Sequence, residues 1–230
     1  MPDASLVSWL KRFIPAPGVL GPSERLRAGL GIFLGLGITT LASTMAVGTI
    51  ADAPLLIAPM GASAILLFAA PASPFAQPWA VIGGHMVAAL VGVTVAHLFG
   101  TPMLAAPLAV ALSFGVMTLF RCVHPPSGAI ALIAVLGGPK VTEMGYSFAL
   151  VPVLLNSVLL IASALIYNNL TGRSFPHAPA QPISPALSLT PEDIDLVLTQ
   201  YGEALDISRE DLEGLYQSLV AHAETKNKSH

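Results

Sequence analysis

Residues 28–50 read AGLGIFLGLGITTLASTMAVGTI, an uncharged apolar stretch of 23 residues. About 20 such residues cross the hydrocarbon core of a bilayer, so this stretch predicts a membrane-spanning helix. It is longer than the apolar core of a secretory signal, which is roughly 7 to 15 residues. We therefore expect it to remain in the protein as the first membrane helix.

The composition extends this prediction to most of the chain. Only 10% of the 230 residues are charged and 54% are hydrophobic, whereas roughly a quarter of the residues in soluble domains are charged. From Ala28 to Pro139 the only formal charges are Asp52 and Arg121. Further apolar segments follow at 55–70, 79–99, 103–120, 127–136 and 146–170. The sequence therefore predicts an all-α, polytopic membrane helical bundle in contact with lipid.

Two of the six apolar segments are short and share a motif. Residues 59–65 read PMGASAI and residues 126–132 read PSGAIAL, and one long segment lies on each side of either copy. This arrangement predicts two three-segment inverted repeats, 26–99 and 103–170, each with one broken helix. Two alternatives stay open. The short segments could be re-entrant loops between four full spans, or the match could reflect only the abundance of small residues in membrane helices.

The two motifs suggest an anion site. A helix that begins inside the membrane has unpaired backbone N–H groups and a partial positive charge at its start, and both attract anions. Proline is suited to a first helical turn, and glycine lets a ligand approach the backbone. The alternative is that proline and glycine only permit a kink and close packing. The predicted substrate-binding residues are Pro59, Gly61, Ala62, Ser63, His124, Pro125, Pro126, Ser127, Gly128 and Ala129.

Three further side chains are candidates for a proton or anion relay. His124 precedes the second motif and His85 lies inside the segment 79–99; a histidine in a membrane is a functional candidate because it changes charge near neutral pH. Arg121 could gather anions at the cytoplasmic mouth, or only anchor a helix end at the interface. His124 could instead be a neutral cap on backbone carbonyls. The spacing of the histidines predicts no metal site, and no cofactor is expected.

The termini differ from the membrane part. The basic residues before Ala28 place the N-terminal segment 1–25 in the cytoplasm, and six crossings of the domain 26–172 place the C-terminus there too. A Pro-rich linker, 173–188, leads to a predicted amphipathic helical hairpin, 189–223, and a tail, 224–230. Residues 184–230 carry a net charge of −6, which disfavours docking on anionic lipid. We expect the hairpin, or the membrane helices, to support a homo-oligomer.

The run Cys122-Val123-His124-Pro125-Pro126-Ser127-Gly128-Ala129 resembles the signature of the HPP family of integral membrane proteins. The first motif and the run from Gln77 to His85 are also similar to that family, and the resemblance covers about residues 20–172. It implies a transporter with four membrane helices, and plant chloroplast members are linked to nitrite transport. It also implies a short, bacterial-type member in the inner membrane.

These observations favour a transporter or channel for a small monovalent anion, with nitrite as the first candidate. The alternative is a non-transporting receptor or scaffold that acts through its acidic C-terminal helices. A membrane enzyme is disfavoured because no carboxylate lies near the histidines in sequence. Nucleic-acid binding is disfavoured because the chain has no basic stripe. The sequence leaves open the identity of the anion, its coupling to protons and the choice between channel and alternating access.

Overall fold

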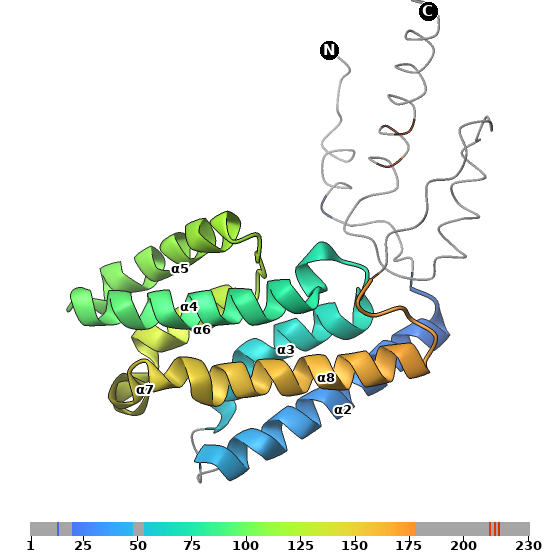
Figure 1. The fold of residues 1–230 in the computed structure, drawn as a ribbon, viewed down its shortest axis with the longest axis horizontal. Helices are drawn as coiled ribbons and strands as arrows, with labels where there is room; N and C mark the ends of the chain where they lie inside the picture. Colours follow the sequence, from blue (N-terminus) through green and yellow to red (C-terminus); the bar gives the residue numbers. More distant parts are fainter. Residues whose placement is uncertain are drawn as a thin grey trace, which may run out of the picture.

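The computed structural model describes residues 20–47 and 53–177, together with residues 13, 212, 214 and 216. Within these residues the chain forms seven α-helices, one 3-10 helix and one π-helix, and no strand. The elements are α2 (Pro22–Val47), α3 (Ala53–Ala69), η1 (Pro74–Ala76), α4 (Pro78–Leu98), α5 (Pro102–Leu119), α6 (Ser127–Leu136), α7 (Gly138–Met144), η2 (Ala149–Leu154) and α8 (Leu155–Leu170). The long helices lie side by side (Figure 1).

Proline and glycine set several helix boundaries. Pro78 and Pro102 stand in the first turns of α4 and α5, where a missing N–H costs nothing because that group would be unpaired. Gly137 ends α6, and Gly145, with φ of 51°, ends α7. Only glycine adopts such a positive φ without steric cost. These prolines and glycines divide an almost uniformly apolar sequence into separate helices.

Long-range hydrogen bonds fix which helix termini share an end of the bundle. Arg27, near the start of α2, donates to the Phe68 carbonyl near the end of α3 and to Asn168 near the end of α8. Trp79, at the start of α4, donates to the carbonyl of Phe120 just after α5. We call this the Arg27 end of the bundle. The loop between α4 and α5 and the helix α7 lie at the opposite end (Figure 1).

Small residues let these helices approach closely. Gly31 and Gly35 of α2 lie one turn apart, and a Cβ atom at either would come within 2.7 Å or less of the Phe68 ring. On α4, a Cβ at Gly92 would lie 2.7 Å from the Ala134 Cβ of α6. Close backbone approach at small residues is how helices associate in lipid, where apolar side chains gain little from leaving the solvent.

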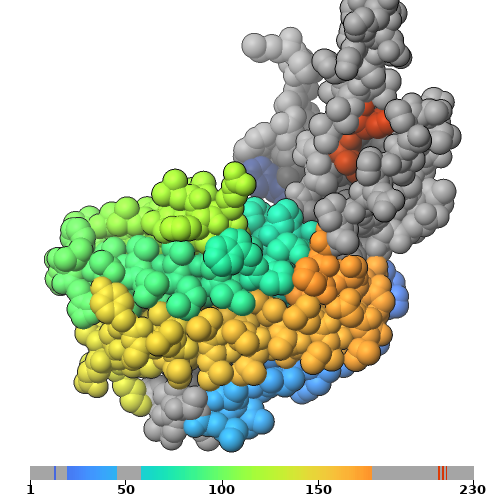
Figure 2. Space-filling model, in the orientation of Figure 1, coloured from blue at the N-terminus to red at the C-terminus, as the bar shows by residue number. Residues whose placement is uncertain are grey.

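The bundle has an apolar surface and encloses a small number of polar side chains in its core. Phe33, Met103, Leu119 and Leu170 are 74%, 90%, 81% and 81% exposed. Several polar side chains are instead fully buried, among them Thr39, Ser43, Ser63, His85, His124, Asn156 and Ser157. In the space-filling view α4 and α8 run side by side across the face turned to the viewer (Figure 2). Such a surface requires lipid around it.

The predicted all-helical membrane bundle is confirmed. Four segments are long and apolar enough to cross a bilayer: Pro22–Met45, Pro78–Leu98, Pro102–Leu119 and Ala149–Leu170. The short segments are also helices, but α3 continues through Pro59, so no helix begins there. Pro59 removes one backbone hydrogen bond from α3, and the helix persists because its other backbone bonds remain. The predicted hairpin 189–223 lies almost entirely outside the described residues.

Candidate functional site

Four fully buried side chains from different parts of the bundle form one chain of hydrogen bonds. Ser63 Oγ of α3 lies 2.8 Å from His124 Nε2 and 3.0 Å from His85 Nε2 of α4. His85 Nδ1 lies 2.7 Å from Ser157 Oγ of α8. We call these four residues the serine–histidine chain. Two histidines that are 39 positions apart are thus joined through one hydroxyl group.

Backbone carbonyls close both ends of the serine–histidine chain. His124 Nδ1 lies 2.7 Å from the carbonyl oxygen of Phe75 in η1, and Ser157 donates to the carbonyl oxygen of Val153 in η2 at 2.7 Å. The two imidazole rings stand edge to face, with centroids 4.8 Å apart and planes at 74°. The chain therefore crosses the interior from η1 to η2.

The turn that carries His124 packs directly against two glycines of α4. A Cβ at Gly84 would lie 2.8 Å from His124 Cβ, 2.8 Å from Ser127 Oγ and 2.9 Å from the Cys122 carbonyl. At Gly83 it would lie 2.8 Å from Cys122 Cβ. Only a residue without a side chain allows this approach. The Gly-Gly-His sequence thus places His85 beside His124.

Some buried polar atoms in the described part of the bundle have no hydrogen-bond partner. Among the described residues, the Oγ atoms of Ser127 and Ser113 and the Nδ2 of Asn156 are buried and have no hydrogen-bond partner, although Asn156 Oδ1 accepts a bond from Ser43 at 2.6 Å. Leaving such a group unpaired costs about 1–3 kcal/mol. Ser127 follows His124 in the motif and Asn156 precedes Ser157, so unused donors stand next to both ends of the serine–histidine chain.

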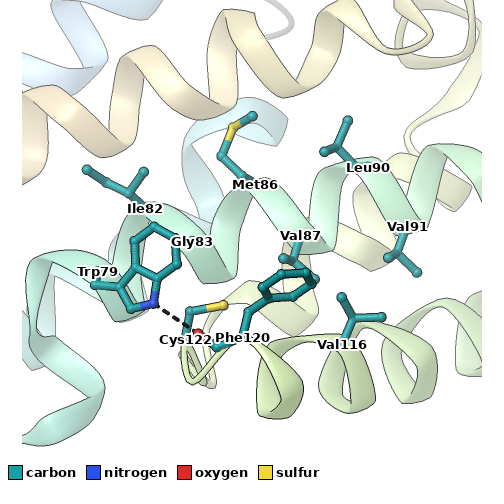
Figure 3. A pocket seen from close by; sticks show the side chains of 10 residues that line it. All are labelled: Trp79, Ile82, Gly83, Met86, Val87, Leu90, Val91, Val116, Phe120 and Cys122. Atoms are coloured by element: carbon teal, nitrogen blue, oxygen red, sulfur yellow. Dashed lines mark hydrogen bonds between the residues drawn. The ribbon is translucent and has the colours of Figure 1, made fainter.

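Two surface grooves approach the site from outside the bundle. One, of about 620 Å³, is lined by Ala62, Ile65, Leu66, Phe75, Pro125 and Pro126, and so brings the two sequence motifs together. The other, of about 470 Å³, is an apolar groove between α4 and α5 that reaches Gly83 and Cys122 (Figure 3). Phe75 and Cys122 therefore border both a groove and the immediate surroundings of the serine–histidine chain.

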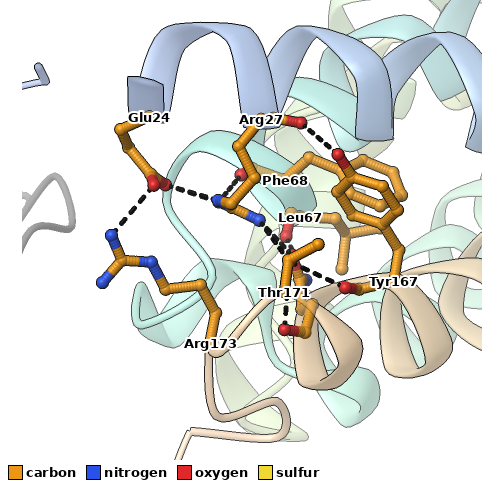
Figure 4. Close-up of polar contacts among 8 residues, drawn as sticks. Glu24, Arg27, Leu67, Phe68, Tyr167, Thr171 and Arg173 are labelled. Carbon is orange, nitrogen blue, oxygen red and sulfur yellow. Dashed lines mark hydrogen bonds and ion pairs between the residues drawn. The ribbon is translucent and has the colours of Figure 1, made fainter. Parts of the chain in front are cut away.

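A second polar cluster occupies the Arg27 end (Figure 4). Arg27 binds Glu24 at 2.6 Å, and Arg173 binds the other oxygen of Glu24 at 2.9 Å. Asn168 accepts from Arg27 and donates to the Leu67 carbonyl, both at 2.9 Å. The cluster ties α2, α3 and α8 together and caps the carbonyl groups at the end of α3.

The predicted site residues divide by exposure. Pro59, Ser63, His85, His124 and Ser127 are buried, whereas Gly61, Pro126 and Gly128 are half-buried and Ala62, Pro125 and Ala129 are exposed. Arg121 is exposed and has a positive φ of 53°, and its guanidinium has no hydrogen bond among the described residues. The structure therefore brings together His85, His124 and Ser63, and leaves Arg121 outside the serine–histidine chain.

The bare helix starts are not found. At the start of α6 the N–H groups of Ser127, Gly128 and Ala129 donate to the carbonyls of His124, Pro125 and Pro126. The His-Pro-Pro sequence folds into a tight turn whose own carbonyls accept these bonds, and α3 begins before its motif. An anion bound here would meet side-chain donors instead of backbone N–H groups.

Three partners in this region were not predicted. Ser157 and the carbonyls of Phe75 and Val153 complete the serine–histidine chain. Ser157 had a usable signal, since Asn156-Ser157 is an isolated polar pair within an apolar segment. The carbonyls had none, because every residue carries one.

A lipid-facing helical bundle with a buried polar chain defines an integral, multi-pass membrane protein. The chain matches the family described as HPP, transmembrane region, over residues 17–176, and it belongs to that family. It is similar to two transmembrane proteins of Dictyostelium discoideum. One is 37% identical over 131 residues, 55% of this chain and 46% of the relative; the other is 38% identical over 118 residues, 50% and 38% of the two chains. No solved structure matches it.

Proposed function

We propose that this protein transports a small monovalent anion across the membrane and that the serine–histidine chain and its neighbours form the binding site. The observation that carries the proposal is the set of buried donors: Ser63, His85, His124 and Ser157 lie together inside an apolar bundle, with the unpaired Ser127 hydroxyl beside them. Polar groups buried at membrane depth are costly and mark solute pathways.

The donor chemistry favours an anion over a cation. Imidazole N–H, hydroxyl and amide groups donate hydrogen bonds, and the carbonyls of Phe75 and Val153 are already occupied. Metal cations prefer carboxylate and free carbonyl oxygens. Within the described range, neither α3, α4, α6 nor α8 carries a carboxylate. A small anion such as nitrite, nitrate or formate would accept a bond from the Ser127 hydroxyl and pair with the positive charge of a protonated imidazole. The family resemblance makes nitrite the first anion to test.

The helix packing supports an inverted repeat as the basis for alternating access. α2 packs on α3 and α8, and α5 packs on α6 and α4. Exchanging the trio α2, α3 and α4 with the trio α5, α6 and α8 reproduces this set of contacts. Two related halves that rock around a fixed site are the common plan of secondary transporters. In this proposal all six segments cross the bilayer, with α3 and α6 as the short crossings.

We also propose that the protein lies in a bacterial inner (cytoplasmic) membrane with a defined orientation. Arg25, Arg27, Arg121 and Arg173 lie at or just beyond helix termini of the Arg27 end. Cytoplasmic flanks carry an excess of such residues, so the Arg27 end faces the cytoplasm. Both chain termini follow this end into the cytoplasm.

The test is anion uptake by purified protein in proteoliposomes. Nitrite entry is followed with nitrate, formate and chloride as competitors, and protein-free vesicles measure the leak of the neutral acid. We expect protein-dependent nitrite entry that is lost in His124→Gln and retained in His97→Gln. His97 lies exposed at the far end of α4 and serves as the matched control. No protein-dependent flux of any of these anions from folded protein would refute the proposal.

A truncation separates transport from the scaffold alternative. Deleting residues 180–230 removes the acidic C-terminal part and leaves the family match, residues 17–176, intact. A transporter core keeps its flux after this deletion, whereas a scaffold that acts through the acidic helices loses its activity.

A further inference from the structure

The serine–histidine chain contains five hydrogen bonds in series. They join the Phe75 carbonyl to His124, His124 to Ser63, Ser63 to His85, His85 to Ser157 and Ser157 to the Val153 carbonyl, at 2.7, 2.8, 3.0, 2.7 and 2.7 Å. Each bond requires one proton between its two heavy atoms. Both terminal groups are carbonyls, which accept and never donate.

When every group is neutral, the serine–histidine chain has one proton too few. Each neutral imidazole supplies one N–H and each hydroxyl one O–H, so the four residues supply four protons for five bonds. The longer bond from Ser63 to the Pro59 carbonyl, at 3.3 Å, competes for the same hydroxyl proton and adds to the shortage. In the neutral state two lone pairs must therefore face each other somewhere along the chain, fully buried.

One added proton satisfies all five bonds, and it does so in two ways. If His124 is the imidazolium, it donates to Phe75 and to Ser63, Ser63 donates to His85, and His85 donates to Ser157. If His85 is the imidazolium, it donates to Ser157 and to Ser63, and Ser63 donates to His124. In both states Ser157 donates to Val153. The two states differ only in the direction of the Ser63 hydroxyl and the position of the charge.

We propose that the serine–histidine chain is a proton site that takes up one proton together with one anion, so that transport is an electroneutral proton–anion symport. This inference rests on the proposed function. The hydrogen-bond geometry favours the added proton, but a lone positive charge buried in an apolar bundle is strongly disfavoured. A bound anion removes this penalty, and the proton in turn gives the anion its counter-charge.

No other charge in the described part of the bundle is placed to neutralise the imidazolium. The elements packed around the pair, α3, α5, α6, η1 and η2, carry no titratable side chain there. The turn contributes the buried Cys122 thiol and the exposed Arg121, and α4 adds only His97 at its far end. α2 carries the exposed Arg25, which donates to the Leu20 carbonyl, and α8 carries Tyr167. Glu24, Arg27 and Arg173 form the cluster that is already paired at the Arg27 end. The helix α7, which packs on α6 at the opposite end, carries Lys140 and Glu143, and both are exposed.

In this proposal the proton passes between the two histidines by two coupled transfers through the Ser63 hydroxyl. His124 gives its Nε2 proton to Ser63 Oγ while Ser63 gives its own proton to His85 Nε2. One N–H bond and one O–H bond break, and one of each forms. The charge thereby passes from the turn before α6, beside the groove at Phe75, to α4 and α8. The proton enters from one side of the membrane and leaves, with the anion, on the other.

The first test measures coupling in proteoliposomes that contain the wild-type protein, a pH-sensitive dye and a potassium–valinomycin clamp of the membrane potential. With nitrite as the probe, we expect one proton taken up per anion and an initial rate that does not change with the clamped potential. Nitrite flux that follows the potential without proton uptake would overturn the symport and leave the proposed function standing. Absence of protein-dependent flux would refute the proposed function itself.

The second test observes the histidines directly and does not depend on transport. Nitrogen NMR of ¹⁵N-histidine protein in lipid nanodiscs distinguishes neutral imidazole from imidazolium, with assignments from His85→Gln and His124→Gln. We expect nitrite, added at constant pH, to convert the pair from neutral to singly protonated. A pair that stays neutral in saturating nitrite, or is protonated without any anion, contradicts joint binding.

Ser63 variants test the relay. Ser63→Ala separates the two imidazoles, so we expect it to lose proton uptake per anion, whereas Ser63→Thr retains a hydroxyl and restores it. Ser163→Ala is the matched control, because Ser163 bonds only the Leu159 carbonyl of its own helix. Unchanged coupling in a folded Ser63→Ala protein refutes the relay. If that variant does not fold, the wild-type coupling ratio and the Ser63→Thr comparison still decide.

Discussion

The two polar clusters of this bundle both join helices through hydrogen bonds, but they differ in charge and in the number of protons available. The cluster at the Arg27 end joins α2, α3 and α8 with formal charges, and all five N–H groups of Arg27 meet an acceptor on Glu24, Phe68, Asn168 or Thr171. The serine–histidine chain joins α3, α4 and α8 without a formal charge and has fewer protons than bonds. A network in which every donor has an acceptor holds the fold together, whereas a network that lacks a proton is suited to binding one.

The largest expected effect is on stability, at the Arg27 end. Arg27→Ala leaves Glu24 with only Arg173 and uncaps the Phe68 carbonyl, so we expect a loss of about 3 kcal/mol in the free energy of unfolding. Thermal unfolding in detergent measures it. Flux per folded molecule should not change, because the serine–histidine chain is intact. A normal melting temperature with lost flux would reverse the roles assigned to the two clusters.

The next effect combines stability and function. Gly84→Ala places a methyl group 2.8 Å from both His124 Cβ and Ser127 Oγ, so the turn must move away from α4. We expect a loss of about 1–3 kcal/mol, as for other overpacked sites, together with loss of flux. Gly115→Ala in α5, where a Cβ meets nothing within 4 Å, is the control. Equal behaviour of the two variants in melting and flux assays would contradict the close approach.

Removing one member of the serine–histidine chain has a smaller effect on stability. Ser157→Ala leaves His85 Nδ1 without its partner, which costs about 1 kcal/mol, but it shortens the chain and lowers anion flux. Ser163→Ala is the control, because Ser163 lies six residues further along α8 and its hydroxyl bonds only the Leu159 carbonyl of the same helix. The two variants are compared for flux at equal amounts of folded protein. Similar flux in both would exclude Ser157 from the site.

The smallest effect is expected at the groove. Trp79→Phe keeps the aromatic wall between α4 and α5 but removes the 3.0 Å bond from the indole N–H to the Phe120 carbonyl. Because this bond is exposed, we expect less than about 1 kcal/mol of destabilisation and normal flux. A large loss of flux would show that the Trp79 bond, and not only the Gly84 contact, positions the turn that bears His124.

Much of the fold was predictable because one property, apolar length, determines it. The segments 79–99 and 103–120 correspond to α4 and α5 within one residue at each end. The first helix begins at Pro22 instead of Ala28, because Glu24, Arg25 and Arg27 remain helical at the Arg27 end. Charge was therefore a poor marker of where this helix begins.

Three of the four members of the serine–histidine chain were predicted as candidates, but their shared network was not. His85, His124 and Ser63 were recognisable as polar residues in apolar surroundings, and they meet. Their shared hydrogen bonds depend on how α3, α4 and the turn before α6 pack, which no local pattern encodes. The expected bare N–H groups failed for a related reason, since the turn at His124-Pro125-Pro126 supplies carbonyls from its own backbone. Backbone partners such as Phe75 leave no mark in a sequence.

The single cysteine of the chain gives this protein a natural reporter. Cys122 is fully buried against Gly83, at the inner end of the groove between α4 and α5 and two residues before His124. A membrane-permeant maleimide can reach its sulfur only when the turn separates from α4. The rate of alkylation in the unmodified protein, with and without anion, therefore measures how often the site opens, with no engineered label and no second thiol to subtract.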